Sequence, residues 1–379
     1  MIFQPPPLGE QELAVLGDIA QLRDALKTSL FEPQRWKGSL RRLSFARNVQ
    51  GSNSIEGYVA DLNDAAAVID DEAPTSVDDE TRRALEGYRN AMTYVLQLCD
   101  ESDDFGYTPQ LLKALHFMMT SYDLKNRPGK WRAGDIYVRS DAREVIVYEG
   151  PSVDLVPALV DELVDTLNTP SGQAVVDAAM AHLNLVMIHP FRDGNGRMAR
   201  CLQSLVLGRD GVLSPVFMSV EEYLGRNTTA YYDTLAAVGG GKWAPDRSSA
   251  QWVRFMLTAH LRQARTQRQR VKDYSRLWVD LVGFLGGNDD SRFLPALLDA
   301  AIGLRITRRG YVALLAQDGV EVSEQSAGRD LKALTEIGWL LPSGEKRGRF
   351  YTAAPAIEGI WRRIRADRPE RDDSDPFAA

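Results

Sequence analysis

Apolar residues recur at helical spacing along most of the chain, with polar residues filling the opposite faces. Between residues 11 and 99 the pattern is clear in LAVLGDIAQLRDAL and TRRALEGYRNAMTYVLQL. It continues from residue 108 to about 265 in PQLLKALHFMMTSY, AVVDAAMAHLNLVMI and SAQWVRFMLTAHL. The chain is therefore predicted to be mainly α-helical.

One segment, DIYVRSDAREVIVYEG, departs from this spacing. Its two β-rich runs, residues 136–139 and 144–148, flank a polar turn. Alternation around such a turn predicts a β-hairpin, here a lone one on a helical body.

The pattern changes again between residues 291 and 354. Helical stretches end at Gly338, and WLLPSGEKRGRFYTA then predicts two short strands around a basic turn. The order resembles a winged helix-turn-helix module, with its second helix at 325–337 and its wing around 344–348. Eight basic and seven acidic side chains between Pro295 and Thr352 leave too little net charge to argue for DNA binding. A protein-interaction or structural role is favoured for this module.

A length of 379 residues exceeds what one hydrophobic core usually serves. We expect a helical N-terminal domain at 1–104, a helical middle domain at 105–268 and the winged-helix-like domain at 269–360. The tail at 361–379 is charged and poor in apolar residues, so it is expected to be disordered.

The net charge, the cysteines and the N-terminal sequence indicate which partners and which cellular compartment to expect. A formal charge of −7 gives no overall attraction to nucleic acid or to an anionic membrane. Cys99 and Cys201 lie within helical patterns and are expected to be buried free thiols. The N-terminus has no signal-peptide pattern, and no apolar run approaches a membrane span, so the cytoplasm is the expected location.

The stretch HPFRDGNGRMAR, residues 189–200, concentrates chemistry at a predicted turn between two helices. Pro190 disfavours helix at His189, and a second helix is expected to begin near Arg197. Backbone amides of Gly194, Asn195 and Gly196 can then converge on an anion at that helix N-terminus. Arg197 and Arg200 share one helix face and could bind phosphate.

Two side chains of this stretch suggest group transfer. Asp193 would repel phosphate unless a divalent cation such as Mg²⁺ lies between them. His189 titrates near physiological pH and could take a proton from an attacking hydroxyl. Taken singly, each of these residues has a more common structural explanation, such as a cap or a turn.

The stretch resembles the Fic family signature, HPFxxGNGRxxR, at every specified position. This resemblance implies a helical Fic catalytic core at 105–268. It further implies transfer of AMP from ATP to a Ser, Thr or Tyr hydroxyl of a protein, with ATP as substrate and Mg²⁺ as cofactor. His189 would be the general base, Asp193 the Mg²⁺ ligand and Phe191 the anchor of the loop. The phosphates would be held by the remaining signature residues: Gly194, Asn195, Gly196, Arg197 and Arg200.

Two further segments extend the resemblance. SVEEYLGRNTTAYYDTL is similar to the family segment near the adenine, which makes Asn227 a candidate nucleotide contact, although Thr228 departs from the basic residue usual there. Tyr231 and Tyr232 are expected to pack in the core. The hairpin matches the family's flap, which would hold the target by strand addition. Its candidate target-binding residues are Ile136, Tyr137, Val138, Val145, Ile146 and Val147.

GSNSIEGYV, residues 51–59, resembles the inhibitory motif of regulated Fic proteins through Ser52, Glu56 and Gly57. Ser52 and Glu56 are four apart and share a helix face, and Gly57 can end that helix. In the family this glutamate pairs with the second signature arginine, here Arg200, and prevents productive ATP binding. Inhibition is therefore expected in cis. By itself, the motif could be an ordinary helix terminus.

The expected function is a self-inhibited, Mg²⁺-dependent protein adenylyltransferase whose partners are ATP, a hydroxyl-bearing protein target and the protein itself. Alternatives are Fic-type transfer of another phosphate-containing group, removal of AMP, or a DNA-binding regulator with a vestigial Fic site. A homodimer, the target and the true donor nucleotide stay open at this point.

Overall fold

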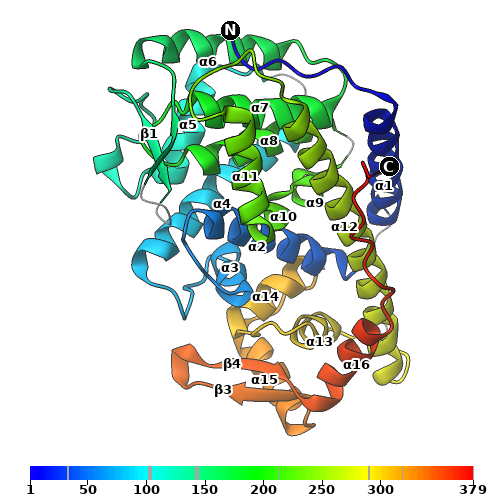
Figure 1. The fold of residues 1–379 in the computed structure, drawn as a ribbon. Coiled ribbons are helices and arrows are strands. Elements are labelled where there is room, and N and C mark those ends of the chain that lie inside the picture. The colour runs from blue at the N-terminus through cyan, green and yellow to red at the C-terminus, as the bar shows by residue number, and fades with distance from the viewer. Residues whose placement is uncertain are drawn as a thin grey trace.

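The computed structural model describes residues 1–31, 34–100, 105–140, 145–211, 213–288, 291–317 and 319–378. Helices dominate these ranges, and the strands form two antiparallel hairpins (Figure 1). None of the described helices combines the length and apolarity that crossing a bilayer requires. The predicted mainly α-helical class is confirmed.

The N-terminal half begins with five described α-helices followed by the hairpin region. The helices are α1 (Glu10–Phe31), α2 (Lys37–Ile55), α3 (Leu62–Ile69), α4 (Asp79–Asp100) and α5 (Pro109–Thr120). Two of their starts have side-chain caps: Asp61 caps α3 by accepting from the Asp64 amide, and Thr108 caps α5 directly before Pro109.

The hairpin consists of β1 (Tyr137–Ser140) and β2 (Val145–Glu149), paired antiparallel with an irregularity between Val138 and Arg139. Both strands lie within one residue of the predicted runs. Residues 141–144, which include part of the predicted turn and the predicted strand residue Glu144, lie outside the described residues.

The middle of the molecule is a helical body around α7 (Ala174–Ile188) and α8 (Asn195–Arg209), which pack against each other (Figure 1). Nearly all of α7 is buried because AVVDAAMAHLNLVMI is apolar on every face. The helices around this pair are α6 (Val156–Asn168), α9 (Pro215–Met218), α10 (Glu221–Arg226), α11 (Thr228–Gly239) and α12 (Ala250–Phe284).

The C-terminal region has the element order expected of a winged helix-turn-helix. It contains α13 (Leu294–Ala301), α14 (Arg308–Gln317), α15 (Glu324–Glu336), the hairpin of β3 (Leu340–Ser343) and β4 (Phe350–Ala353), and α16 (Pro355–Ala366). A single bridge between Ile306 and Tyr351 adds a third strand-like segment. Short 3-10 helices occur at Leu124–Asn126, Val153–Leu155 and Lys346–Gly348.

The predicted boundary between residues 268 and 269 is wrong, because it falls inside the continuous helix α12. Buried residues on both sides of it, among them Gln267 and Val271, face the same core. One cluster of buried side chains runs from Ile2 to Ile364, so residues 1–104 also share the core of the middle region.

The predicted disorder of the tail is also corrected. Residues 361–366 complete α16, and residues 367–378 run along α12 (Figure 1). Arg276 pairs with Asp367 at 2.7 Å and Arg265 with Asp372 at 2.6 Å, while the Arg254 guanidinium lies 5.1 Å from the Phe377 ring centroid. Sequence composition missed this because the acidic tail meets a complementary arginine-rich helix face.

Candidate active site

His189 terminates α7 in a left-handed conformation with φ of 51°. Its Nδ1–H donates to the Val186 carbonyl at 3.1 Å, since a carbonyl can only accept. In the neutral ring Nε2 therefore carries the lone pair, and no described residue hydrogen-bonds to it. Burial lowers the pKa of His189, which favours this neutral form.

The loop after His189 is fixed by packing and by one side-chain amide. The Phe191 ring is fully buried, stacked on His116 at 3.7 Å between centroids and close to Trp131. Asn195 accepts from the Phe191 amide and donates to the Phe191 carbonyl, both at 2.9 Å. Its side chain thus closes the loop, so a phosphate contact from Asn195 would have to come from its backbone N–H.

The helix α8 begins at Asn195, two residues earlier than predicted. Gly194 precedes it with φ of 74°, a conformation that glycine adopts without penalty. The amides of the first turn of α8 are left without helical partners, and they lie where the anion site was predicted.

His116 is a supporting residue that sequence reasoning missed. Its Nδ1 accepts from the Gly129 amide and its Nε2–H donates to the Asp193 carbonyl, both at 2.9 Å. Burial lowers its pKa to about 4, so the ring is neutral and holds one tautomer. His116 thereby ties the signature loop to α5. No local sequence pattern in α5 indicates that contact.

Arg132 is a second missed residue, and it satisfies backbone carbonyls around the loop. Its Nε donates to the His189 carbonyl at 3.0 Å, and its backbone amide donates to the Pro190 carbonyl at 2.8 Å. Its two terminal nitrogens reach the carbonyls of Gly134 and Pro151. The C-terminal end of α7 is thus held in place by a buried cation.

The Arg197 guanidinium is buried between aromatic residues. It donates to the Tyr122 hydroxyl at 2.9 Å and lies 5.1 Å from the Tyr58 ring centroid. Its Nε is buried and makes no hydrogen bond within the described residues. Tyr58 and Tyr122 were not among the predicted site residues, because each lies far from the signature in sequence.

Arg200 contacts the predicted inhibitory motif. Its Nε donates to the Ser52 hydroxyl at 2.8 Å, and its Nη2 donates to the Ser52 carbonyl at 2.9 Å and to Glu56 Oε1 at 2.6 Å. Burial disfavours the charge, but Glu56 more than offsets this and raises the pKa of Arg200. Arg200 Nη1 remains buried without a hydrogen bond to any described residue.

Glu56 reaches Arg200 because helix α2 ends directly before it and Gly196 has no side chain. Gly57 follows with φ of 89°, as expected for a residue that ends a helix. A Cβ on Gly196 would lie 2.3 Å from Glu56 Oε1. The carboxylate therefore lies over the first turn of α8, where an anion would bind.

The Asp193 side chain is half exposed, and the carboxylate has only long contacts within the described residues, 3.5 Å to Asn126 and 3.9 Å to Arg197. Within the described residues, no group of three or more His, Cys, Asp or Glu side chains is placed to hold a metal. A cation here would take its other ligands from phosphates and water, which is how Mg²⁺ is commonly bound. The residues present fit Mg²⁺ on those terms.

The predicted nucleotide segment lies against α2. Asn227 joins α10 to α11 and donates to the Tyr223 carbonyl at 2.8 Å. Tyr231 is buried, as predicted, and its hydroxyl bonds His182 at 2.9 Å. Tyr232 departs from the prediction of core packing, because it is 47% exposed and donates to the Ile55 carbonyl beside Glu56.

The predicted flap is anchored close to the signature. Tyr148 of β2 is buried and donates to the Met187 carbonyl, two residues before His189, at 2.9 Å. Farther out, Tyr137 and Ile146 are each 51% exposed. Val145 is described only through its backbone pairing with Ser140.

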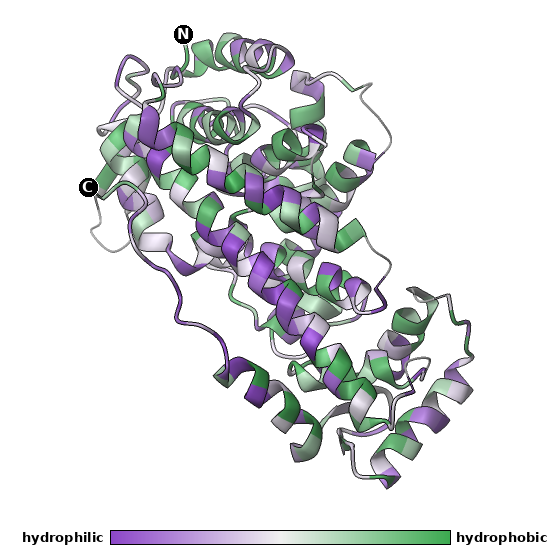
Figure 2. Ribbon diagram, turned by 90° about the vertical axis from the view of Figure 1, so that its right-hand side faces the viewer, coloured by the Kyte–Doolittle hydropathy of each residue, from purple (hydrophilic) through white to green (hydrophobic). Residues whose placement is uncertain are grey.

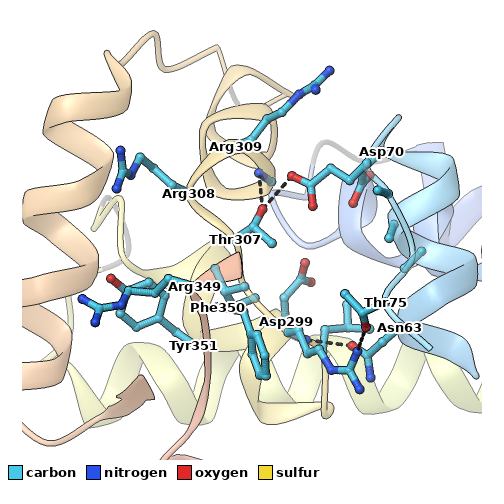
Figure 3. Close-up of a pocket in the computed structure, with 18 of the residues that line it drawn as sticks. Asn63, Asp70, Thr75, Asp299, Thr307, Arg308, Arg309, Arg349, Phe350 and Tyr351 are labelled. Carbon is cyan, nitrogen blue, oxygen red and sulfur yellow. Dashed lines mark hydrogen bonds between the residues drawn. The ribbon is translucent and has the colours of Figure 1, made fainter. Parts of the chain in front are cut away.

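A separate cavity of about 840 Å³ lies between the α3 region and the C-terminal module. Figure 3 shows Thr307 within it, Arg308 and Arg349 on one side, and Asp70 and Asn63 on the other. Six basic and six acidic residues line it, so its walls balance in charge. It includes none of the signature residues.

Residues 106–207 match the model of the Fic/DOC family. The chain carries a Fic/DOC domain. Protein adenylyltransferase fic-1 of Caenorhabditis briggsae is 38% identical over 110 residues, covering 27% of this chain and 20% of that protein. Protein adenylyltransferase Fic of Aedes aegypti is 29% identical over 243 residues, covering 62% of this chain and 44% of that protein. This chain thus spans less than half the length of either relative.

The Fic fold extends beyond the matched domain. A crystal structure of a Fic family protein from Desulfovibrio desulfuricans G20 has a TM-score of 0.58 and 21% identity, covering 93% of this chain and 99% of that one. At this identity the likeness concerns the fold. It includes most of the regions before and after the Fic/DOC domain.

Proposed function

We propose that this chain is a protein adenylyltransferase that transfers AMP from ATP to a protein hydroxyl and is inhibited in cis by Glu56. The observation that carries the proposal is the Glu56–Arg200 pair, placed over the N-terminal turn of α8 and one loop away from an oriented His189. The relatives named protein adenylyltransferase support the reaction type.

The residues present fit a polyphosphate. Arg197 Nε and Arg200 Nη1 are buried donors without partners in the described part of the chain, and they accompany the backbone amides that begin α8. Asp193 would hold Mg²⁺, which supplies charge neutralisation between the carboxylate and the phosphates. Asn227 and Tyr232 lie on the segment proposed to meet the adenine.

His189 acts on the incoming hydroxyl in this proposal. As the hydroxyl oxygen bonds to the α-phosphorus, its proton passes to Nε2, and the bond from the α-phosphorus to the bridging oxygen breaks. AMP stays on the target and pyrophosphate leaves. The flap formed by β1 and β2 would hold the target segment by adding it as a strand.

The Glu56 carboxylate opposes nucleotide binding in two ways. While it holds Arg200 Nη2, that nitrogen cannot donate to phosphate. Its negative charge also lies where the polyphosphate would approach. AMP transfer by the wild-type protein is therefore expected to be slow.

The test compares the wild type with Glu56→Gly after incubation with ATP and Mg²⁺, using intact-mass spectrometry. Automodification should rise by about tenfold or more, since each ~1.4 kcal/mol removed from the barrier is a factor of ten. The added mass identifies the transferred group, which separates AMP from another phosphate-containing group. Glu80→Gly, an exposed glutamate at the start of α4, should behave as the wild type.

The double change Glu56→Gly with His189→Ala should be inactive, because removing the inhibitor does not replace the base. If the wild type and Glu56→Gly modify themselves equally, the inhibitory role is wrong and residues 52–57 are an ordinary helix end.

A further inference from the structure

A cavity of about 570 Å³ lies between α2, α10, α12, α16 and the start of the tail, and it contains none of the signature residues. Eight arginines and three acidic residues line it. Its size is that of small-molecule sites. The excess of positive charge is local, because the whole chain has a formal charge of −7.

The inner wall is built around one buried carboxylate, Glu222. Arg270 binds both of its oxygens, at 2.7 and 2.5 Å, and Arg226 donates to one of them at 2.5 Å. Arg47 Nε lies 3.9 Å from the same carboxylate. Burial would raise the pKa of Glu222, but these cations hold it at about 2. One negative charge thus faces three positive charges.

Of the three arginines around Glu222, Arg47 has the fewest hydrogen-bond partners among the described residues. Burial, followed by the neighbouring Arg270, lowers its pKa, and its Nη1 is buried without a hydrogen bond to the described residues. An unpaired buried donor beside like charges is unfavourable. Its cost would be offset by an anion in the cavity that Arg47 lines.

The outer wall is partly covered by the acidic tail, which Figure 2 shows as predominantly hydrophilic. Arg265 pairs with Asp372 at 2.6 Å, Arg371 pairs with Asp373 at 3.1 Å, and Arg262 donates to the carbonyl of Asp373 at 2.5 Å. Arg365 also lines the cavity and is exposed, and no described residue forms an ion pair with it. These tail contacts are exposed, so they contribute little energy and can be exchanged.

We propose that this cavity binds a small ligand carrying two or more phosphate groups, and that the tail at 367–378 covers the site until the ligand displaces it. The planar guanidinium fork matches phosphate oxygens in pairs. Several arginines converging on one enclosed volume can neutralise a polyphosphate, which a single surface pair cannot do. The acidic residues of the tail supply a weaker substitute for that charge.

The polyphosphate could be free or part of a nucleotide. Trp361 lines the same cavity and offers a ring on which a base could stack. Titrations with inorganic tripolyphosphate and with ATP, both without Mg²⁺, separate the two sources. Equal affinity means that the phosphates alone are bound. Tighter binding of ATP that is lost in Arg226→Ala with Arg365→Ala means that the base contributes in this cavity, and not at the signature.

The experiment is titration calorimetry of the full chain with tripolyphosphate. The double change Arg226→Ala with Arg365→Ala should weaken binding by about tenfold or more, since it removes two arginines that line the cavity and lie outside the tail. Both side chains are exposed, so the fold should be retained. Asp372→Asn with Asp373→Asn should strengthen binding, because it weakens the competing tail. Arg276→Ala is the matched control on α12, because Arg276 pairs with Asp367 but does not line the cavity.

Binding that is unchanged in the arginine double variant, or lost equally in Arg276→Ala, would overturn the proposal. So would binding of a DNA duplex by a protein that does not bind tripolyphosphate, because the surface would then recognise a macromolecule. If tripolyphosphate bound at the signature instead, the wild type and all three variants would bind it with the same affinity, which would also overturn the proposal. Failure of the proposed transferase function would therefore leave this test intact.

Discussion

At the scale of single residues, one hydrogen bond determines which nitrogen of His189 can act as a base. Because Nδ1–H is committed to Val186, the proposed transfer requires the proton of the target to go to Nε2. His189→Ala in the Glu56→Gly background should lower the transfer rate by about 10² to 10⁴. Nucleotide affinity should persist, because the ring contacts none of the phosphate-binding donors. Rates and nucleotide titrations of the same variant check both expectations.

The pH dependence of Glu56→Gly tests the state of the same imidazole. Burial lowers the pKa of His189 below 6.5, so the ring stays neutral above that pH and the base is fully available. The kcat/KM for transfer should fall only as pH drops through the lowered pKa, giving an acid limb with a midpoint below 6.5. A midpoint above 6.5 would contradict a buried neutral base.

Asp193 has a separate and measurable expectation. Asp193→Ala should weaken Mg²⁺-dependent nucleotide binding by about tenfold or more, because the carboxylate tolerates nearby phosphates only through the metal. Calorimetry of Glu56→Gly proteins with and without Mg²⁺ measures the difference. Asp161→Ala, an exposed aspartate on α6, serves as a charge-matched control. An equal gain from Mg²⁺ with and without Asp193 would show that the metal is held elsewhere.

At the scale of elements, α2 and α10 cross so closely that only glycines fit at the contact. A Cβ on Gly51 would lie 2.5 Å from the Glu221 carbonyl oxygen, and one on Gly225 would lie 2.9 Å from backbone atoms of Gly51. This crossing brings Ser54, two residues before Glu56, against Gly225, two residues before Asn227, because a Cβ on Gly225 would lie 3.1 Å from Ser54 Oγ. The proposed inhibitor and the proposed nucleotide segment thus share one rigid contact.

Gly51→Ala should therefore destabilise the protein by about 1 to 3 kcal/mol, since α10 has to shift. Gly17→Ala on α1 is the control, because no atom lies within 4 Å of its new methyl group. That change should raise the free energy of unfolding by up to about 1 kcal/mol through helix propensity. Denaturant unfolding of both variants measures the contrast, and similar values for the two would show that the crossing is not tight.

Local patterns predicted most elements but not all of their limits. The helices and the lone hairpin follow from apolar spacing, and Glu56 and Arg200 meet as the motif resemblance implied. The limit placed at 268 failed because the sequence there becomes rich in arginine and glutamine without any helix breaker. The first strong stop is Gly286–Gly287, where both residues have positive φ. His116 and Arg132 were missed because their contacts with the loop depend on tertiary packing.

At the scale of the whole molecule, Arg42 of α2 joins the N-terminal region to the C-terminal module. Its two terminal nitrogens bind Asp70, which follows α3, and Asp299 of α13. Burial is the first cause that raises the pKa of both carboxyls, that of Asp70 to about 6. The helix that precedes Glu56 is thereby connected to the module.

Arg42→Ala should lower the free energy of unfolding by about 3 kcal/mol or more at pH 7, because two buried carboxylates lose their cation. The loss should shrink toward pH 5. Carboxyls whose pKa is raised in the folded state bind protons there, and stability is recovered as pH falls. Arg41→Ala, an exposed neighbour, should change little. Equal losses in the two variants at pH 7 would show that the junction contributes no special stability.

The uninterrupted α12 limits how this chain can be divided. Its 35 residues span roughly 52 Å and contribute buried side chains to the body around α7 and to the module around α13. A fragment ending at residue 268 would expose the apolar surface against which Tyr274 and Leu277 pack. A fragment starting at residue 269 would lack the first half of α12, which anchors the module to the body around α7. The helical body around α7 and the winged-helix-like module are therefore not interchangeable parts, and a recombination event that exchanged one of them would have to carry α12 with it.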